Sequence, residues 1–329
     1  MPTRVTISQS DLPGTDVEQS VFMDAKGDYQ IVTGQATTES KLIEMAEGSK
    51  GLLLQYAEVS ERVLASLPEL KVISRYGIGV DTIDIDAATK YDVAVTNVPS
   101  YCEEEVATHA LALLLSVVRN TSGYDKQIKS GLWDWKAGKP LLPMRNKTLG
   151  FMAFGKIPRT LIQITAGFDL EYIAYDPYLN PADVQDVPVE IVSWDELLTD
   201  SDYISIHAPL VNATRGKFNR AAFSKMQDNV ILINTARGEI VDEDALDWAL
   251  SKGEIFGAGI DVIEGEPRAN SPLFNHENIV ISPHVAWYSE RSINELRRKA
   301  AENIVLYLQD QTAHGIINPE VIEPSFGHQ

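Results

Sequence analysis

Residues 150–159 read GFMAFGKIPR and lie where a strand-like apolar run, KTLGFMAF, passes into a helix-like run. A turn of the form G-x-G-x-x-G at such a junction brings backbone N–H groups close to a pyrophosphate at the start of the helix. Only the middle glycine of that pattern, Gly155, is present, because Ala153 and Pro158 occupy the outer positions. The stretch by itself therefore fits an ordinary strand-to-helix turn as well as a nucleotide-binding turn.

The two replaced positions affect the turn differently. Ala153 costs little if its φ is negative, because a methyl group is unfavourable only where the chain needs a left-handed conformation. Pro158 is tolerated if it lies in the first helical turn, where backbone N–H groups have no intrahelical partner. It nevertheless removes one donor from the helix N-terminus, so we expect phosphate binding to be weakened or altered.

An acidic residue at the end of the next strand-like run supports the nucleotide interpretation. Asp176 follows Gly155 by 21 residues, which matches the spacing at which a carboxylate contacts the adenosine ribose. A carboxylate accepts a hydrogen bond from a free 2′-hydroxyl but repels a 2′-phosphate. If the turn binds a dinucleotide, Asp176 therefore favours NAD(H) over NADP(H).

Alternating strand-like and helix-like runs extend on both sides of this turn. The first hundred residues contain RVTISQ, YQIVTG, KVISRYGIG and similar runs, and a second alternation extends from TLGFMAF to NIVISPHVAW. Strands separated by helices indicate a parallel sheet that is covered on both faces. We therefore expect an α/β fold with two doubly wound parallel-sheet domains, in which ligands bind beyond the carboxyl ends of the strands.

Two long helix-like runs indicate how the domains are connected. The final one, SERSINELRRKAAENIVLYLQD, is amphipathic and long enough to return to the first domain. The predicted domains are therefore residues 1–101 together with 289–329, and an inserted domain at 102–288. The helix predicted within 103–120 is apolar nearly all the way round, so we expect it to lie between layers or against another subunit.

Composition and charge exclude several classes of partner. The chain of 329 residues has 28 basic and 47 acidic side chains, a formal net charge of −19. That charge repels phosphate backbones and anionic lipids, so we expect no nucleic-acid or membrane partner. The start of the chain lacks an apolar secretion signal, and the apolar stretch near 110–118 is too short to span a bilayer. The single cysteine, Cys102, excludes an intrachain disulfide. We expect a cytoplasmic protein without a bound metal.

Three residues that could carry chemistry follow successive strand-like runs: Arg237 after ILINTA, Glu266 after GIDVIEG, and His284 after IVISP. The carboxyl ends of parallel strands open onto one crevice, so these side chains are expected to converge. A guanidinium suits bidentate binding of a carboxylate, and a histidine paired with a carboxylate can exchange a proton near neutral pH. Each residue alone also fits a structural role, as a turn arginine, an exposed loop acid or a core histidine.

Two further strand ends contribute candidate residues. In RYGIGVD, residues 75–81, the exposed N–H groups of Ile78 and Gly79 could hold a substrate carboxylate, although the segment also fits a plain turn. The run SIHAPL has His207 and Pro209 at another strand end, where the proline also fits a simple strand terminator.

Over nearly its whole length the chain resembles the D-isomer-specific 2-hydroxyacid dehydrogenase family. The segments that carry the resemblance, in the family's order, are RYGIGVDTIDIDAA, AVTNVP, HAPLVNATRGKFN, LINTARGEIVDEDAL, AGIDVIEGEP and SPHVAWYSE. The last is particularly similar to the C-terminal-binding-protein branch, whose members keep a dehydrogenase fold and bind NAD(H). The resemblance implies a flavodoxin-like substrate-binding domain at 1–101 and 289–329, and an inserted Rossmann NAD-binding domain at 102–288.

The resemblance also implies roles for individual residues. Arg237 corresponds to the substrate-binding arginine, His284 to the general acid/base, and Glu266 to its partner. The implied NAD contacts are Gly155, Lys156, Ile157, Asp176, His207, Ala208, Pro209, Thr214, Thr235, Ala236 and Asp261. The implied substrate contacts are the backbone donors of Ile78 and Gly79, and Trp287 would shape the pocket. Tyr76 is a further candidate substrate contact, because specificity depends on the shape of the pocket around Tyr76, Tyr101 and Trp287.

Some features of the resemblance bear on assembly and on cofactor binding. The helix within 103–120 is similar to the family's dimer-forming element, which implies a homodimer through the NAD-binding domain. Family members usually have glycine at the positions of Ala153 and Pro158, so we expect cofactor binding to be weakened or altered here. Thr108 stands where a glutamate is common in the family.

We therefore predict an NAD-dependent oxidoreductase that interconverts a small 2-oxo acid and its D-2-hydroxy acid by hydride transfer. The alternative is an NAD(H)-sensing interaction protein of the C-terminal-binding type with little turnover. A third interpretation, a scaffold that has lost NAD, is disfavoured by the presence of Arg237, Glu266 and His284 together. Neither the substrate nor the direction of the reaction follows from the sequence.

Overall fold

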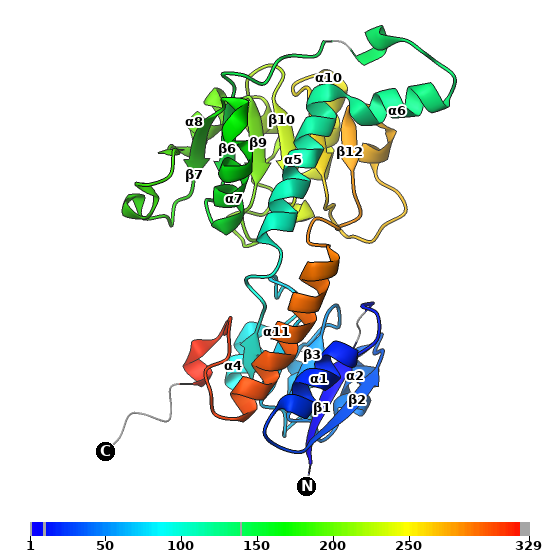
Figure 1. The fold of residues 1–329 in the computed structure, drawn as a ribbon, viewed down its shortest axis with the longest axis vertical. Coiled ribbons are helices and arrows are strands. Elements are labelled where there is room, and N and C mark those ends of the chain that lie inside the picture. The colour runs from blue at the N-terminus through cyan, green and yellow to red at the C-terminus, as the bar shows by residue number, and fades with distance from the viewer. Residues whose placement is uncertain (1, 9–10, 139, 323–329) are drawn as a thin grey trace. The chain divides into compact units, whose positions relative to one another are not determined.

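The computed structural model describes residues 2–8, 11–138 and 140–322. The chain divides into two compact units, which we call unit 1 (residues 1–101 and 289–329) and unit 2 (residues 102–288). Each unit is built around one parallel sheet with helices packed against it (Figure 1). The predicted fold class, two doubly wound parallel-sheet domains, is confirmed.

Unit 1 contains a five-stranded parallel sheet of order β2-β1-β3-β4-β5. Its strands are β1 (Thr3–Ser8), β2 (Tyr29–Gly34), β3 (Gly51–Leu54), β4 (Val72–Arg75) and β5 (Ala94–Thr96). Its helices are α1 (Asp16–Asp24), α2 (Glu39–Ala46), α3 (Glu61–Ser66), α4 (Ile85–Lys90) and α11 (Glu290–Leu308). The central strand β3 is buried along its whole length, as expected for a parallel strand that is covered on both faces.

Helix α11 returns to unit 1 and packs against α1, β3 and β4, as the sequence predicted. It brings Arg297 into a buried ion pair with Glu18 of α1, in which the guanidinium Nη2 lies 2.7 Å from the carboxylate Oε2. Both side chains are almost fully excluded from solvent. A buried charge is tolerated only when it is paired and hydrogen-bonded, so this contact fixes where the last helix docks.

Unit 2 contains a seven-stranded parallel sheet of order β12-β11-β10-β9-β6-β7-β8. Its strands are β6 (Thr148–Met152), β7 (Glu171–Tyr175), β8 (Glu190–Ile191), β9 (Tyr203–Ile206), β10 (Ile231–Asn234), β11 (Gly257–Ile260) and β12 (Ile279–Ile281). Its helices are α5 (Glu103–Arg119), α6 (Thr121–Lys129), α7 (Lys156–Thr165), α8 (Trp194–Asp200), α9 (Arg220–Phe223) and α10 (Glu243–Lys252). The strand order reverses between β6 and β9, which is where a doubly wound sheet binds its ligand.

Helix α5 lies against β10, β11 and α7 with one face fully buried. Its close approach depends on small residues in β11, because a Cβ added at Gly259 would lie 2.8 Å from the Cβ of Leu113. The face that carries Thr108 and Ala112 remains exposed. The sequence predicted that this helix lies between layers or against another subunit. Packing within unit 2 covers one face of the helix, and the described residues leave the other face uncovered.

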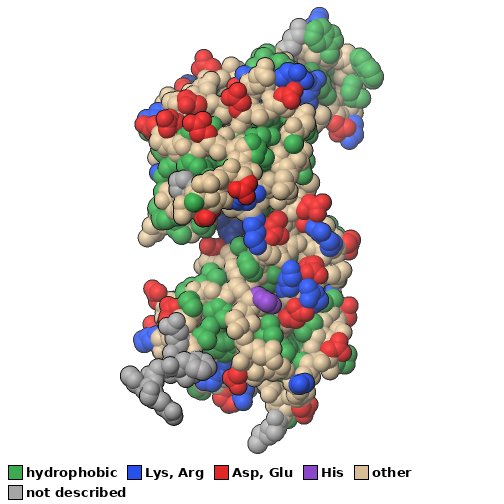
Figure 2. Space-filling model, turned by 60° about the vertical axis from the view of Figure 1, so that its left-hand side comes forward, with side chains coloured by type: hydrophobic (Ala, Val, Ile, Leu, Met, Phe, Trp, Pro, Cys, Tyr) green, Lys and Arg blue, Asp and Glu red, His purple; other side chains and the backbone are tan. Residues whose placement is uncertain are grey.

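The segment after α5, residues 120–138 and 140–145, forms an arm that extends away from the sheet of unit 2 (Figure 1). Hydrophobic side chains gather on this arm (Figure 2), among them Trp133 at 88% exposed and Trp135 at 65% exposed. In the described part of the chain, no helix is long and apolar enough to cross a membrane.

Candidate active site

The turn at 153–158 joins β6 to α7 at the switch point of the sheet. Ala153 has φ of 68°, in the left-handed region, and its N–H donates to the carbonyl of Tyr175 at 2.9 Å. The condition under which alanine would cost little, a negative φ, is therefore not met. This conformation costs an L-residue roughly 1–2 kcal/mol, which explains why glycine suits the position.

Gly155 is the N-cap of α7 and has a negative φ of −92°. A Cβ added to it would meet no atom within 4 Å, so open space lies in front of the helix N-terminus. Lys156 and Ile157 are the first two helical residues, and Pro158 follows them inside the first turn, as predicted. The side-chain ammonium of Lys156 lies 3.5 Å from the carboxylate of Glu103.

Asp176 follows the last residue of β7 and faces the same turn. One carboxylate oxygen accepts from the N–H of Phe154 at 3.0 Å, and the other accepts from the N–H of Tyr178 at 3.0 Å. The carboxylate is thereby held beside the middle of the G-x-G-x-x-G-like turn. A fixed acceptor next to an open helix N-terminus is the arrangement that a dinucleotide requires.

The loop after β10 carries Thr235, Ala236 and Arg237. The side chain of Asn234 closes this loop by donating to the carbonyl of Arg237 at 2.9 Å and accepting from the N–H of Ala236 at 3.0 Å. The hydroxyl oxygen of Thr235 is buried and has no hydrogen-bond partner. Because buried polar atoms are nearly always paired, this oxygen indicates a group that the described residues do not supply.

Gly238 sets the distance between the loop after β10 and the loop after β11. A Cβ at this position would lie 2.1 Å from the carbonyl carbon of Ile263 and 2.4 Å from the backbone nitrogen of Glu264. Both contacts are with backbone, so a larger residue would force the loops apart. Because Gly238 has no side chain, the loop after β10, which carries Arg237, can pack against the loop after β11, which carries Glu266.

His284 and Glu266 lie in contact. The imidazole Nδ1 faces Oε1 of the Glu266 carboxylate, and the other carboxylate oxygen accepts from the N–H of Ile263 at 3.0 Å. Trp287 donates its indole N–H to the carbonyl of His284 at 2.9 Å. His284 and Glu266 remain partly exposed, at 41% and 30%, so both can meet a ligand. Arg237 follows β10, which neighbours β11 in the sheet.

Asp261, predicted as an NAD contact, is 1% exposed at the end of β11. Its carboxylate accepts from the N–H groups of Val285 and Ala286, at 3.0 and 2.8 Å, and from the hydroxyl of Ser282 at 2.5 Å. Burial raises the pKa of this carboxyl, but its hydrogen bonds together lower the pKa below the ordinary value. The carboxylate therefore organises the loop that carries His284.

Sequence reasoning missed His109, whose imidazole Nε2 lies 2.8 Å from the hydroxyl of Ser282 and 3.5 Å from the Asp261 carboxylate. The signal that could have found it is a histidine within the otherwise apolar middle of α5. Sequence reasoning also missed Asn234 and Gly238, which shape the loop of Arg237.

The predicted residues from His207 to Thr214 form a closed loop after β9. The imidazole of His207 pairs with the hydroxyl of Ser205 at 2.8 Å, and burial lowers the pKa of His207 to about 3. This ring is therefore neutral at physiological pH. Ala208 is buried and Pro209 is exposed. Thr214 closes the loop by donating its hydroxyl to the carbonyl of Pro209 at 2.7 Å.

In unit 1, the predicted backbone donors Ile78 and Gly79 follow β4, and Ile78 is 41% exposed. Asn97 fixes this loop by donating its side-chain amide to the carbonyl of Ile78 at 2.7 Å. The prediction that the Tyr76 side chain contacts substrate is wrong for this structure. Tyr76 is 2% exposed, and its hydroxyl donates to Glu18 at 2.9 Å, because the ring fills the core of unit 1.

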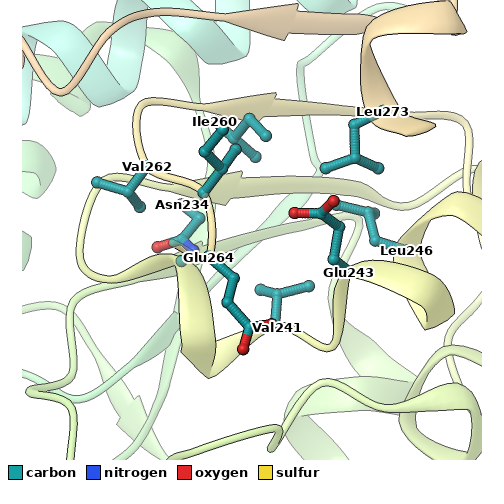
Figure 3. A pocket seen from close by; sticks show the side chains of 10 residues that line it. Asn234, Val241, Glu243, Leu246, Ile260, Val262, Glu264 and Leu273 are labelled. Carbon is teal, nitrogen blue, oxygen red and sulfur yellow. The ribbon is translucent and has the colours of Figure 1, made fainter. Parts of the chain in front are cut away.

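A small cavity of about 10 Å³ lies behind the loops that follow β10 and β11. Figure 3 shows the side chains around it, including Asn234, Glu243 and Glu264. It has room for about one water molecule, so it belongs to the packing of these loops. Among the described residues, no group of His, Cys, Asp and Glu side chains is arranged to hold a metal ion.

Comparison with known proteins identifies the family. Residues 111–286 match the model described as D-isomer specific 2-hydroxyacid dehydrogenase, NAD binding domain. The chain is 35% identical over 276 residues to a glyoxylate reductase of Thermococcus litoralis, across 82% of this chain and 83% of the relative. It is 34% identical to a D-3-phosphoglycerate dehydrogenase of Mycobacterium tuberculosis, of which it spans 54%, so it covers about half the length of that longer relative.

Solved structures agree with this assignment. A D-lactate dehydrogenase from Aquifex aeolicus, complexed with NAD and lactic acid, matches 95% of this chain and 99% of its own, with a TM-score of 0.84 and 26% identity. An acyclic imino acid reductase in complex with NADPH and D-Arg matches 96% of this chain and 100% of its own, with a TM-score of 0.86 and 25% identity. The chain belongs to the D-isomer-specific 2-hydroxyacid dehydrogenases, a family of NAD-dependent oxidoreductases.

Proposed function

We propose that this protein reduces a small 2-oxo acid to the D-2-hydroxy acid with NADH, and catalyses the reverse reaction with NAD. The observation that carries the proposal is the contact between His284 and Glu266 at neighbouring strand ends, with Arg237 following the next strand of the sheet. Family membership and relatives named as reductases and dehydrogenases support it.

In this proposal His284 is the general acid that protonates the carbonyl oxygen of the substrate. Its Nδ1 faces Glu266, so Nε2 is the ring nitrogen that remains for the substrate. The Glu266 carboxylate holds the orientation of the imidazole through the contact with Nδ1, as in other histidine–carboxylate pairs. The guanidinium of Arg237 binds the substrate carboxylate through its planar fork of donors.

The residues of unit 2 fit a bound nicotinamide dinucleotide, which supplies the hydride. Gly155 leaves space for the pyrophosphate beside the N–H groups of Lys156 and Ile157. Asp176 offers an acceptor for the ribose hydroxyls, and the unpaired Thr235 oxygen offers another polar contact. We also propose that NAD(H) is preferred over NADP(H), because the Asp176 carboxylate repels a 2′-phosphate.

The proposed roles of the two units follow from these residues. Unit 2 is the NAD-binding domain. Unit 1 is the substrate-binding domain, in which the N–H groups of Ile78 and Gly79 contact the substrate carboxylate. The hydrogen bond from Asn97 to the Ile78 carbonyl supports this role because it holds the loop in one conformation. In unit 2, Trp287 would border the substrate beside His284.

We further propose that a second copy of the chain covers this arm of unit 2 (residues 120–138 and 140–145) and the exposed face of α5. The high exposure of Trp133 and Trp135 supports this proposal, because large apolar side chains in a contiguous exposed patch mark interaction surfaces. A variant with both tryptophans changed to serine should shift the molar mass measured by light scattering from dimer to monomer. A monomeric wild-type chain would refute the proposal.

The reductase proposal is tested with glyoxylate, pyruvate and hydroxypyruvate as substrates. His284→Ala should lower kcat by about 10²–10⁴-fold while the Kd for NADH, measured by fluorescence titration, changes little. Undiminished turnover in that variant would refute the proposed role of His284. No turnover by the wild type, combined with tight NADH binding and a peptide partner, would instead favour the interaction protein that the sequence left as an alternative.

A further inference from the structure

Beneath the loop that carries His284 lies a polar cluster made of Asp261, Ser282 and His109. The three side chains come from the end of β11, the end of β12 and the middle of α5. His109 Nε2 lies 2.8 Å from Ser282 Oγ, and Ser282 Oγ lies 2.5 Å from Asp261 Oδ1. The imidazole is 26% exposed, whereas the carboxylate side chain is fully buried. The cluster thus connects α5 to the loop that carries His284.

The hydrogen-bond directions in this cluster follow from the donors that each group possesses. A serine hydroxyl has one hydrogen, and Ser282 donates it to the Asp261 carboxylate. The Ser282 oxygen can then only accept from His109, so Nε2 of that imidazole carries a hydrogen. His109 is therefore the outermost donor of a chain that ends on a buried anion.

The buried anion determines the conformation of the His284 loop. Asp261 accepts from the backbone N–H groups of Val285 and Ala286 through its carboxylate, and from that of His284 through its carbonyl at 2.7 Å. His284 itself has φ of 53°, a left-handed conformation that is unfavourable for a residue with a Cβ. Such a conformation persists only when the surrounding contacts impose it.

Loss of the His109 N–H donor would change the position of the His284 loop. Without a partner on α5, the Ser282 oxygen would lose its acceptor bond, and the end of β12 would lose its polar contact with that helix. Ser282 would keep its hydrogen bond to Asp261, but the loss of a donor in a buried polar site is unfavourable, so the cluster would rearrange or admit water. The segment from Ser282 to Ala286 is bonded to the same Asp261 carboxylate and would shift with it.

We propose that His109 is a positioning residue, which acts through Ser282 and Asp261 to keep the His284 imidazole aligned with Glu266 and the substrate. This inference rests on the proposed reductase function and goes beyond it, because His109 touches neither substrate nor cofactor in that mechanism. Its contribution is geometric: a displacement of about 1 Å in a catalytic group can cost on the order of 100-fold in rate.

The test compares His109→Leu, which removes the donor, with His109→Gln, whose amide nitrogen extends about as far as Nε2 and still donates. The leucine variant should lower kcat by about 10- to 100-fold and leave the Kd for NADH within about two-fold. The glutamine variant should recover most of the lost rate. The matched control is His276→Leu, which breaks another histidine–aspartate pair of unit 2, with Asp247 at 2.8 Å, and should leave kcat unchanged.

Two results would overturn the proposal: full turnover in His109→Leu, or equal impairment of the leucine and glutamine variants, which would indicate only a packing role. The imidazole NMR resonances give a readout that does not require turnover, since the chain has six histidines. The His284 resonances should shift in His109→Leu and return toward the wild-type positions in His109→Gln. If the wild type reduces no oxo acid, the proposed function fails, and unshifted His284 resonances in His109→Leu would independently refute the positioning role.

Discussion

Changing Gly155 to alanine should separate cofactor binding from folding. A Cβ at this position meets no atom within 4 Å, so the methyl group has space in the folded chain. The backbone angles of Gly155, φ of −92° and ψ of −149°, lie outside the regions that L-residues favour, and alanine is a weaker N-cap than glycine. The thermal unfolding midpoint of Gly155→Ala should therefore fall by only a few degrees, which corresponds to about 1 kcal/mol.

The same methyl group should weaken NADH binding, because it occupies the space through which the pyrophosphate approaches the helix. The first two helical residues of α7, Lys156 and Ile157, each carry an N–H group, whereas Pro158 has none. Loss of one hydrogen bond to a charged group costs roughly 1.5–3 kcal/mol, which corresponds to an increase in Kd of about 10- to 150-fold. A fluorescence titration with NADH measures this change.

Gly167→Ala provides the matched control, because a Cβ at Gly167 also meets nothing within 4 Å and the residue lies at the opposite end of α7. It should leave the NADH affinity unchanged, with an unfolding midpoint equal to that of the wild type or slightly higher. If Gly155→Ala binds NADH as tightly as the wild type, or if both variants lose affinity equally, the turn at 153–158 does not hold the pyrophosphate.

Three further predictions concern the site and the stability of the fold. Gly238→Ala should unfold at a lower temperature and lose on the order of 100-fold in kcat/KM, because its Cβ would lie 2.1 Å from the Ile263 carbonyl carbon; an unchanged melting curve would contradict this. Burial lowers the pKa of His207 to about 3, whereas the pKa of an unfolded histidine lies near 6.5. Between these two values the unfolded chain binds more protons than the folded chain. The free energy of unfolding must therefore fall as the pH drops from about 6.5 to about 3. The free energy of unfolding measured in urea should fall by about 2 kcal/mol between about pH 7 and pH 5 because of this group. In His207→Gln this part of the pH dependence should be absent. The net charge of −19 should make the unfolding midpoint rise when KCl is increased from about 50 mM to about 1 M; a flat response would show that self-repulsion is negligible.

Much of the architecture could be predicted because it depends on local patterns. Apolar runs separated by helical periods specify parallel strands, and residues that directly follow such runs must lie at the carboxyl edge of the sheet. Arg237, Glu266 and His284 were found in this way, and the structure brings Glu266 and His284 into contact. The position of Pro158 within the first turn of α7 likewise followed from the local order of strand and helix.

The predictions that were wrong or incomplete concern quantities that depend on packing. The φ of Ala153 is positive at the point where the chain leaves β6 and turns towards α7, and no local pattern specifies this angle. Tyr76 follows a strand as Ile78 does, yet its ring turns into the core to meet Glu18 of α1. Whether a side chain at a strand end faces inward or outward is decided by the helix that covers that end.

Periodicity and short motifs are properties of neighbouring residues, so the two-sheet architecture, the family resemblance and the residues at the strand ends could be read from them. Folding was needed to show that Asp261 holds the His284 loop and that His109 contacts Ser282, a residue 173 positions away along the chain. The physical reason is that a buried carboxylate must collect donors from whatever elements pack around it. Which elements those are is fixed by how α5 docks on the glycines of β11.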